Sequence, residues 1–484
     1  MIIPFSSRQL AVLALLAATV ASPAAAADNT FDRHFTDQTL RFDYYHSGTS
    51  GNSPQEHISA DRLRREGPWP GSRTRLLDDT DLGKYRFLVI DPATGTLLYS
   101  RGFASIYGEW ETTGEAHAGL WRTFHESQRF PEPRTPVRLA LEKRSPAGDW
   151  HEIYSAVFDP AATTVDRSPV LASGTVTVLF EHGPPATKVD LLLVGDGYTR
   201  SDALEFVADA DRLTAALFAT EPFGRRRGDF NARALFVASP ESGITDSTTG
   251  VWRNTPLGLA YGAFGSERYV LTEANRELRE IAAQAPYDAL ILLANSRKYG
   301  GGGIHGLWTT AAAGSGQAAY LVVHEFGHSF AGLTDEYYTS PVSYEELTPP
   351  GTEPWEPNVT ALGDPERLKW RDLVSDGTPL PTAWRQERFD EASRAYQKRR
   401  EALRAAGAPE EEMEALFAEI EAVTEPMLHS EEHWGEVGAF EGAAYQARGL
   451  YRPYLDCIMF TRNPEWFCPV CARAIERVID LYAE

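Results

Sequence analysis

Between residues 28 and 166, short runs of alternating apolar and polar side chains are separated by residues that favour turns. The runs occupy residues 39–45, 85–90, 96–100, 137–142 and 151–158. The connecting segments 91–95 and 145–149 each combine Pro, Gly and Asp, which suit hairpin turns. Short strands at this spacing predict an N-terminal all-β sandwich over residues 28–166.

From about residue 175 onward the pattern is that of an α/β domain. After a linking strand near residues 176–181, unbroken apolar runs predict strands, and helical periodicity predicts helices in between. The expected strands are 189–194, 234–238 and 289–294, and the expected helices are 203–216 and 271–283. The four glycines at 300–303 lack the Lys-Ser/Thr of a phosphate loop, so we expect a rim strand or flap that pairs with extended substrate.

A charged segment interrupts this second domain at about residues 383–425. Ala, Glu and Arg recur there at helical spacing, with a break at 407–409. The pattern predicts an αα-hairpin with solvated faces. Such an insertion is either a surface elaboration or a cap over a cleft.

The most informative segment is His324-Glu-Phe-Gly-His328. On a helix the two histidines lie one turn apart on the same face, so both imidazoles can reach one Zn²⁺. Glu325 then lies beside the metal, where its carboxylate can take a proton from water. Apolar residues around the motif indicate a helix held by a core, and Gly332 suits the C-terminal cap of that helix.

The third metal ligand follows from the spacing after Gly332. In metzincin zinc proteases the last ligand comes three residues after such a glycine, which here predicts Asp335. This chain has one residue more than that pattern between His328 and Gly332, so Glu336 is an alternative. A distant acid such as Glu436 or Glu441 is a further alternative. Two histidines and one carboxylate leave the fourth position open, as in catalytic zinc sites.

The motif region as a whole resembles the bacterial IgA-peptidase family of secreted zinc metalloendopeptidases. The similarity runs through residues 324–338 and through further blocks at 193–199, 222–224, 230–231, 239–243, 295–303, 437–443, 449–453, 457–459 and 467–471. The resemblance implies a zincin-type, metzincin-like catalytic domain over residues 175–484. It also implies peptide-bond hydrolysis with one zinc ion held by His324, His328 and Asp335. It does not imply that immunoglobulin is the substrate.

Other side chains near the motif have candidate roles. Tyr445, Tyr451 and Arg462 are candidate donors to the oxyanion that forms when a peptide bond is attacked, and spacing selects none of them. Met459 suits the methionine turn that metzincins place beneath the zinc, although it also suits an ordinary core position.

Three cysteines lie near the C-terminus, at positions 457, 468 and 471. In an oxidising compartment their odd number favours one disulfide, which we expect to include Cys457, and one free thiol. The alternative is a thiolate site for a second metal, because Cys468 and Cys471 have Cys-x-x-Cys spacing.

The amino terminus predicts export. Arg8 precedes an apolar run at residues 10–20, and three alanines before Asp28 suit signal-peptide cleavage, so residues 1–27 are the expected signal peptide. The run is too short for a typical membrane span, and the mature protein is expected in the periplasm or outside the cell.

Length and charge narrow the expected partners. The 484 residues suit two domains, and the net charge of −22 disfavours nucleic acid and anionic membranes. We expect a protein or peptide substrate, with glycan or protein contact through the N-terminal sandwich as a further role for that domain. The alternatives to a peptidase are a zinc amidase acting on cell-wall or other non-protein amides, and a non-catalytic binding or adhesion protein on the same fold.

Overall fold

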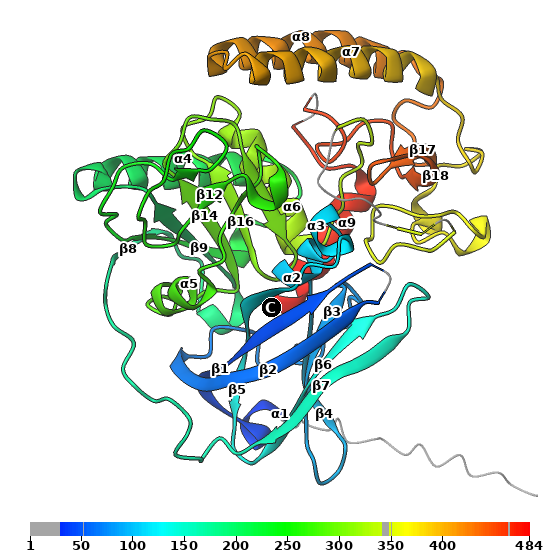
Figure 1. Ribbon diagram of the computed structural model, residues 1–484. Helices are drawn as coiled ribbons and strands as arrows, with labels where there is room; N and C mark the ends of the chain where they lie inside the picture. The colour runs from blue at the N-terminus through cyan, green and yellow to red at the C-terminus, as the bar shows by residue number, and fades with distance from the viewer. Residues whose placement is uncertain (1–29, 52, 341–347, 350, 463–464) are drawn as a thin grey trace, which may run out of the picture.

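The computed structural model describes residues 30–51, 53–340, 348–349, 351–462 and 465–484. The predicted signal peptide lies outside these residues. The described chain has a β-rich N-terminal region and a mixed α/β region, which Figure 1 shows below and above the point where the C-terminus lies.

The N-terminal region is a sandwich of two antiparallel sheets. One has the strand order β2-β1-β5 and the other the order β4-β3-β6-β7. Their bounds are β1 Phe35–Thr49, β2 Gln55–Pro68, β3 Tyr85–Ile90, β4 Leu97–Phe103, β5 Arg122–Pro133, β6 Val137–Arg144 and β7 Trp150–Phe158. Buried aromatic side chains from both sheets meet between them, and the ring centroids of Phe87 and Phe130 lie 5.4 Å apart. The short helices of this region are α1 Thr30–His34, α2 Ile106–Trp110 and α3 Gly114–His117.

The outer face of β1 is buried as well, unlike the solvated face that alternation usually gives. Arg41 and Asp43 are fully buried there and form an ion pair of 2.7 Å. Arg41 also pairs with Glu66 of β2 and, across the domain boundary, with Glu280 of helix α5 (Asn275–Ala282). The buried polar residues of β1 therefore link the N-terminal region to the α/β region.

The α/β region is built on a six-stranded sheet with the order β15-β16-β14-β9-β10-β8. Its central neighbours are parallel, and the strands at both edges are antiparallel. The bounds are β8 Thr175–Phe180, β9 Val189–Asp196, β10 Phe230–Phe236, β14 Ala289–Ala294, β15 Gly301–Ile304 and β16 Trp308–Ala312. A smaller sheet contains β11 Thr245–Asp246, β12 Ala260–Tyr261 and β13 Val270–Leu271.

Both faces of the large sheet are covered, which explains the unbroken apolar runs. In β9, Leu191 and Leu193 pack with helices α4 (Ala203–Ala219) and α6 (Ala318–Ala331). Leu192 and Val194 face the other side, where α5 and the α2 region of the N-terminal domain cover them. The helix expected at 271–283 starts only at Asn275, because Val270 and Leu271 belong to β13.

The C-terminal part adds the predicted helical hairpin and a final helix. The hairpin consists of α7 Gln386–Ala405 and α8 Glu410–His429, and Figure 1 shows it across the top of the molecule. One face of each helix is buried in the main core, for example at Phe389 and Phe417, so the expectation of solvated faces was wrong for these sides. The remaining elements are β17 Phe440–Ala443, β18 Gln446–Arg452 and α9 Pro469–Tyr482.

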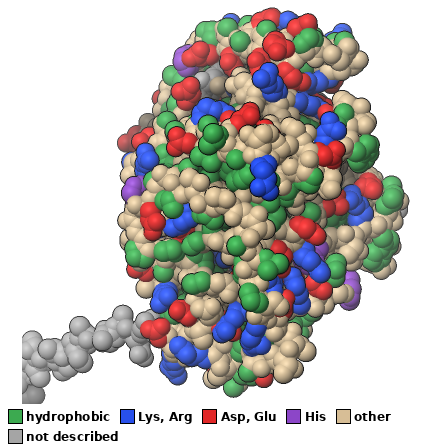
Figure 2. Space-filling model, turned by 90° about the vertical axis from the view of Figure 1, so that its left-hand side faces the viewer, with side chains coloured by type: hydrophobic (Ala, Val, Ile, Leu, Met, Phe, Trp, Pro, Cys, Tyr) green, Lys and Arg blue, Asp and Glu red, His purple; other side chains and the backbone are tan. Residues whose placement is uncertain are grey.

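Six short 3₁₀ turns connect these elements within the described residues. They span Pro185–Thr187, Arg200–Asp202, Arg227–Asp229, Ala263–Gly265, Pro365–Arg367 and Arg371–Leu373. The face drawn in Figure 2 carries Lys and Arg side chains interspersed with Asp and Glu. Among the residues with a described position, no helix has both the length and the apolar composition to cross a bilayer.

Candidate metal centre

Helix α6 carries the His-Glu-x-x-His motif and is held by its apolar side. Phe326 and Phe330 are buried in the main core, with ring centroids 4.9 Å apart. Gly327 allows the segment around Met459 to approach, because a Cβ at this position would lie 3.1 Å from the Met459 sulfur. The helix ends at Gly332, whose φ of 61° is left-handed and whose N–H donates to the carbonyl of His328. The chain then turns back towards the helix.

This turn places Asp335 against both histidines. Asp335 Oδ1 lies 3.0 Å from His324 Nε2 and 3.2 Å from His328 Nε2. The two Nε2 atoms are themselves 3.2 Å apart. Ligands held at 2.0–2.1 Å in a tetrahedral zinc site lie about 3.4 Å from one another, so this spacing fits a single ion.

The other ring nitrogens fix which tautomer each histidine adopts. His324 Nδ1 lies 2.9 Å from the carbonyl oxygen of Ile458, and His328 Nδ1 lies 2.6 Å from that of Leu333. A carbonyl can only accept, so each Nδ1 carries a hydrogen. In the neutral rings both Nε2 lone pairs therefore point towards Asp335, as in metal-binding histidines.

Electrostatics in this cluster follow from burial and from the carboxylate. Burial by itself would lower the pKa of His328, but the charge of Asp335 outweighs it and raises that pKa to about 9. For Asp335, burial acts to raise the pKa, and the two histidines outweigh it and hold the pKa well below its usual range. Burial raises the pKa of Glu325, and the nearby histidines oppose that rise only in part.

Glu325 faces a cavity of about 330 Å³ that His328, Asp335 and Tyr445 also line. Strand β15 runs along this cavity. A Cβ at Gly301 would come within 3.3 Å of Glu325 Cγ, and one at Gly303 would lie 2.2 Å from the Glu325 carbonyl oxygen. The predicted rim strand is thus the edge strand of the sheet, and its glycines make room for helix α6.

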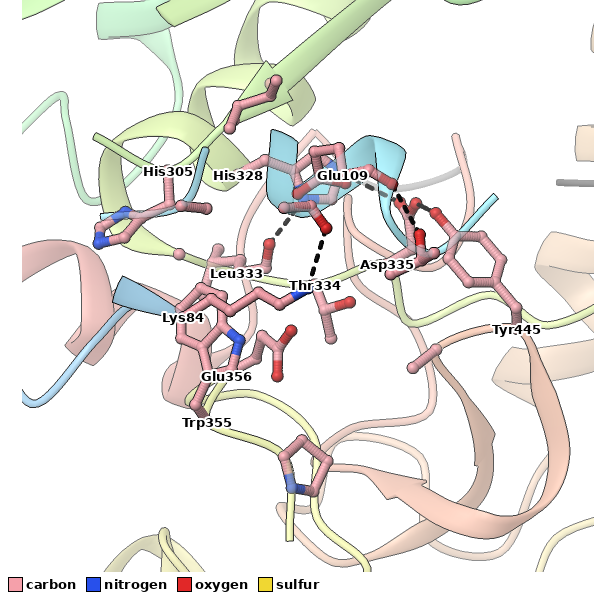
Figure 3. Close-up of a pocket in the computed structure, with 18 of the residues that line it drawn as sticks. Lys84, Glu109, His305, His328, Leu333, Thr334, Asp335, Trp355, Glu356 and Tyr445 are labelled. Carbon is pink, nitrogen blue, oxygen red and sulfur yellow. Dashed lines mark hydrogen bonds and ion pairs between the residues drawn. The ribbon is translucent and has the colours of Figure 1, made fainter. Parts of the chain in front are cut away.

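The three candidate oxyanion donors lie in different places. The Tyr445 hydroxyl donates to Asp335 Oδ2, and Figure 3 shows the ring beside that carboxylate. Tyr451 instead sits in β18, where its backbone pairs with Thr360. Arg462 lines an adjoining cavity of about 100 Å³ beneath the helical hairpin, which His324 and Glu325 also line, and donates to the Tyr396 hydroxyl at 2.9 Å.

The other acids considered as the third metal ligand lie outside the cluster of His324, His328 and Asp335. Glu336 is fully buried and groups with Cys457, Cys468 and Cys471. Glu436 accepts from Thr378, and Glu441 pairs with Arg448. All three cysteines are free in the structure, which therefore does not contain the disulfide expected from the sequence.

Part of the cavity wall comes from residues that the sequence did not indicate. Lys84 and Glu109 of the N-terminal sandwich line it, together with Trp355 and Glu356 from the segment after the motif (Figure 3). His305 also lies there, and burial lowers its pKa to about 4. Local periodicity carries no signal for such long-range docking, so these residues were not accessible to sequence reasoning.

Comparison with known proteins identifies the family of this chain. The fold and site just described are those of a candidate hydrolase whose possible metal ligands are two histidines on helix α6 and Asp335 in the turn that follows it. The family model IgA Peptidase M64 matches residues 177–479, and the model Peptidase M64 N-terminus matches residues 30–155. Because the first match covers more than half of the sequence, the chain belongs to the IgA peptidase M64 family, and this membership supports a peptidase. No curated protein matches the chain.

Proposed function

We propose that this protein is an exported, zinc-dependent endopeptidase whose single catalytic zinc is held by His324, His328 and Asp335. Family membership supports the hydrolysis of peptide bonds. The main support for a bound metal is that His324 Nε2, His328 Nε2 and Asp335 Oδ1 lie 3.0–3.2 Å from one another.

The chemistry divides between the ion and the chain. When bound, zinc supplies a Lewis acid that polarises the scissile carbonyl and lowers the pKa of water. The Glu325 carboxylate takes a proton from the attacking water and passes it to the departing amine. Burial favours its protonated form, which suits a group that must release the proton again. The Tyr445 hydroxyl is the nearest of the three candidate donors to the metal ligands and steadies the developing oxyanion.

Substrate binding uses the cavity and its edge strand. Strand β15 pairs with β16 on one side, and Gly301 bridges Tyr269 on the other, so an extended peptide can add to that second side beyond Gly301, at Gly303. The wall that Lys84 and Glu109 provide makes the N-terminal sandwich part of the substrate site. This placement favours a role in substrate contact over a role as a distant spacer.

The proposal is tested by incubating purified protein with casein and, separately, with peptidoglycan fragments, each with and without a chelator. We expect cleavage of casein at internal bonds, loss of cleavage with chelator, and recovery on adding zinc. Cleavage of peptidoglycan amides alone would identify a zinc amidase. Absence of turnover on both substrates by zinc-loaded protein would favour the non-catalytic binding protein.

A further inference from the structure

A second cluster of metal-ligand side chains lies behind the first. Its members are Glu336, Cys457, Cys468 and Cys471, and each is fully buried. One ligand atom from each residue lies within 4.8 Å of the corresponding atoms of the other three. The chain thus brings three sulfurs and a carboxylate to one point from three separate segments.

The hydrogen bonding of the cluster is incomplete in a way that indicates a ligand. Glu336 Oε1 accepts from Asn358 Nδ2 at 3.1 Å and from the Cys471 thiol at 3.2 Å. Glu336 Oε2 has no hydrogen-bond partner among the described residues, although the side chain is fully buried. A buried carboxylate oxygen without a partner is unfavourable unless a cation or a further donor satisfies it.

Two features beside the sulfurs favour a thiolate. The backbone N–H of Cys468 points to Cys457 Sγ at 3.3 Å. Cys468 is also the N-terminal cap of α9, where the helix dipole favours negative charge.

We propose that Glu336, Cys457, Cys468 and Cys471 bind a second, structural zinc ion. Thiolates select zinc among the common divalent ions, and four protein ligands make a closed site. With Zn–S bonds of 2.3 Å, neighbouring sulfurs in a tetrahedral site lie about 3.8 Å apart, which the observed grouping accommodates. A disulfide would use two of the sulfurs and leave the third facing a buried carboxylate. None of the four side chains lines the cavity of Glu325 or the adjoining cavity under the hairpin.

This second ion would hold the ligands of the catalytic centre in place, because two of its own ligands are adjacent in sequence to residues of that centre. Glu336 follows Asp335, and its N–H donates to the carbonyl of Met459 at 2.8 Å. Cys457 precedes Ile458, whose carbonyl fixes the His324 ring. One closed site thereby ties the Asp335 loop and the Met459 turn to helix α9.

The experiment measures bound zinc and the cobalt spectrum for the full-length protein, without reference to activity. Wild type should hold close to two zinc ions per chain. The double variant His324→Ala/His328→Ala should keep about one zinc ion per chain. The double variant Cys468→Ser/Cys471→Ser should lose the ion that the histidine variant keeps. After cobalt substitution, the histidine variant should retain the sulfur-to-cobalt charge-transfer absorption, and the cysteine variant should lack it.

Two further measurements apply even if the cysteine variant fails to fold. Denatured wild type with chelator should titrate as three free thiols, whereas native, metal-loaded protein should protect them. Glu336→Gln, which keeps the side-chain volume, should weaken binding of the second zinc at least tenfold, with Glu436→Gln as the matched control. A disulfide-linked peptide in mass spectrometry, or a wild-type protein with one zinc that disappears in the histidine variant, would overturn the second site. Because none of these readouts uses turnover, the second site and the proposed peptidase can fail independently.

Discussion

Asp335 and Glu336 are consecutive residues, yet their carboxylates belong to two different clusters. Asp335 joins two histidines at the edge of a cavity of about 330 Å³, with Tyr445 and Glu325 beside it. Glu336 joins three cysteines in the core, away from that cavity. The first arrangement, the open cluster, would leave room for water and substrate at a bound metal, whereas the second, the closed cluster, would surround an ion on all sides. Ligand type and access, more than sequence position, separate a catalytic centre from a structural one.

The largest expected effect is the difference in catalytic zinc content between a variant that lacks the Asp335 carboxylate and one that lacks the Glu336 carboxylate. Asp335→Ala should abolish the binding of catalytic zinc and with it nearly all peptidase activity, because one of three protein ligands is lost. Glu336→Ala should leave the catalytic zinc in place. Zinc analysis together with the cobalt spectrum measures the two sites separately, because only the cysteine site gives sulfur-to-cobalt charge-transfer absorption. The reverse result would make Glu336 the catalytic ligand, as the extra residue before Gly332 allows.

Glu325→Gln should separate coordination from proton transfer within the open cluster. The substitution removes the base but no ligand, so zinc content should stay near that of wild type while kcat/KM falls by about 10²–10⁴-fold. Steady-state cleavage of casein or a fluorogenic peptide measures the loss. The exposed Glu205→Gln on α4 is the matched control. Activity at a tenth of wild type or more would remove Glu325 from the mechanism.

Tyr445→Phe should have a smaller effect, confined to the open cluster. Loss of one oxyanion donor lowers kcat by about 100-fold with little change in KM. Tyr451→Phe, on β18, should behave like wild type. If Tyr445 serves only to hold Asp335, its loss should instead weaken zinc binding with kcat restored at saturating zinc, and a zinc titration of both variants decides between these roles.

The smallest expected effect concerns a buried charge cluster in the N-terminal sandwich that belongs to neither metal-ligand set. Burial acts to raise the pKa of Glu56, but His46 and Lys143 outweigh it and lower the pKa from 4.5 to about 2. A depressed carboxyl pKa stabilises the fold above the unfolded value, and this contribution is lost as pH falls from about 4.5 to about 2. The contribution is at most about 3 kcal/mol.

Glu56→Gln should therefore lower the melting temperature at pH 7 and make it less sensitive to acid between these two pKa values. Thermal unfolding followed by circular dichroism across this range measures both changes. The surface variant Glu152→Gln provides the comparison. If the melting temperature of Glu56→Gln fell with pH as steeply as that of wild type, the interactions of Glu56 with His46 and Lys143 would not contribute to the acid dependence of stability.

Much of the open cluster could be predicted from the sequence, because its determinants are local. Four-residue spacing put His324 and His328 on one helix face, and Gly332 indicated the turn that returns Asp335. The closed cluster could not be predicted in the same way. Its three cysteines lie within fifteen residues, and their spacing allowed a thiolate metal site only as an alternative. Glu336 lies more than a hundred residues earlier, and nothing in the pattern around it indicates that its side chain meets three sulfurs.

The fold shows the same division between local and long-range information. Apolar runs predicted β9 and β14 well, because strands buried on both faces leave a local signature. The start of α5 was missed, since apolar residues of β13 extended its helical pattern. Docking of the sandwich against the cavity, through Lys84 and Glu109, depends on tertiary contacts that periodicity does not encode.

An anomalous difference map at the zinc edge, from crystals of the full-length protein, tests the two-cluster account most directly. The account predicts one peak about 2.0–2.1 Å from His324 Nε2 and His328 Nε2, and beside Asp335. It predicts a second peak about 2.3 Å from the sulfurs of Cys457, Cys468 and Cys471. A map without the first peak would contradict the proposed catalytic centre, and a map with a disulfide in place of the second would contradict the structural site.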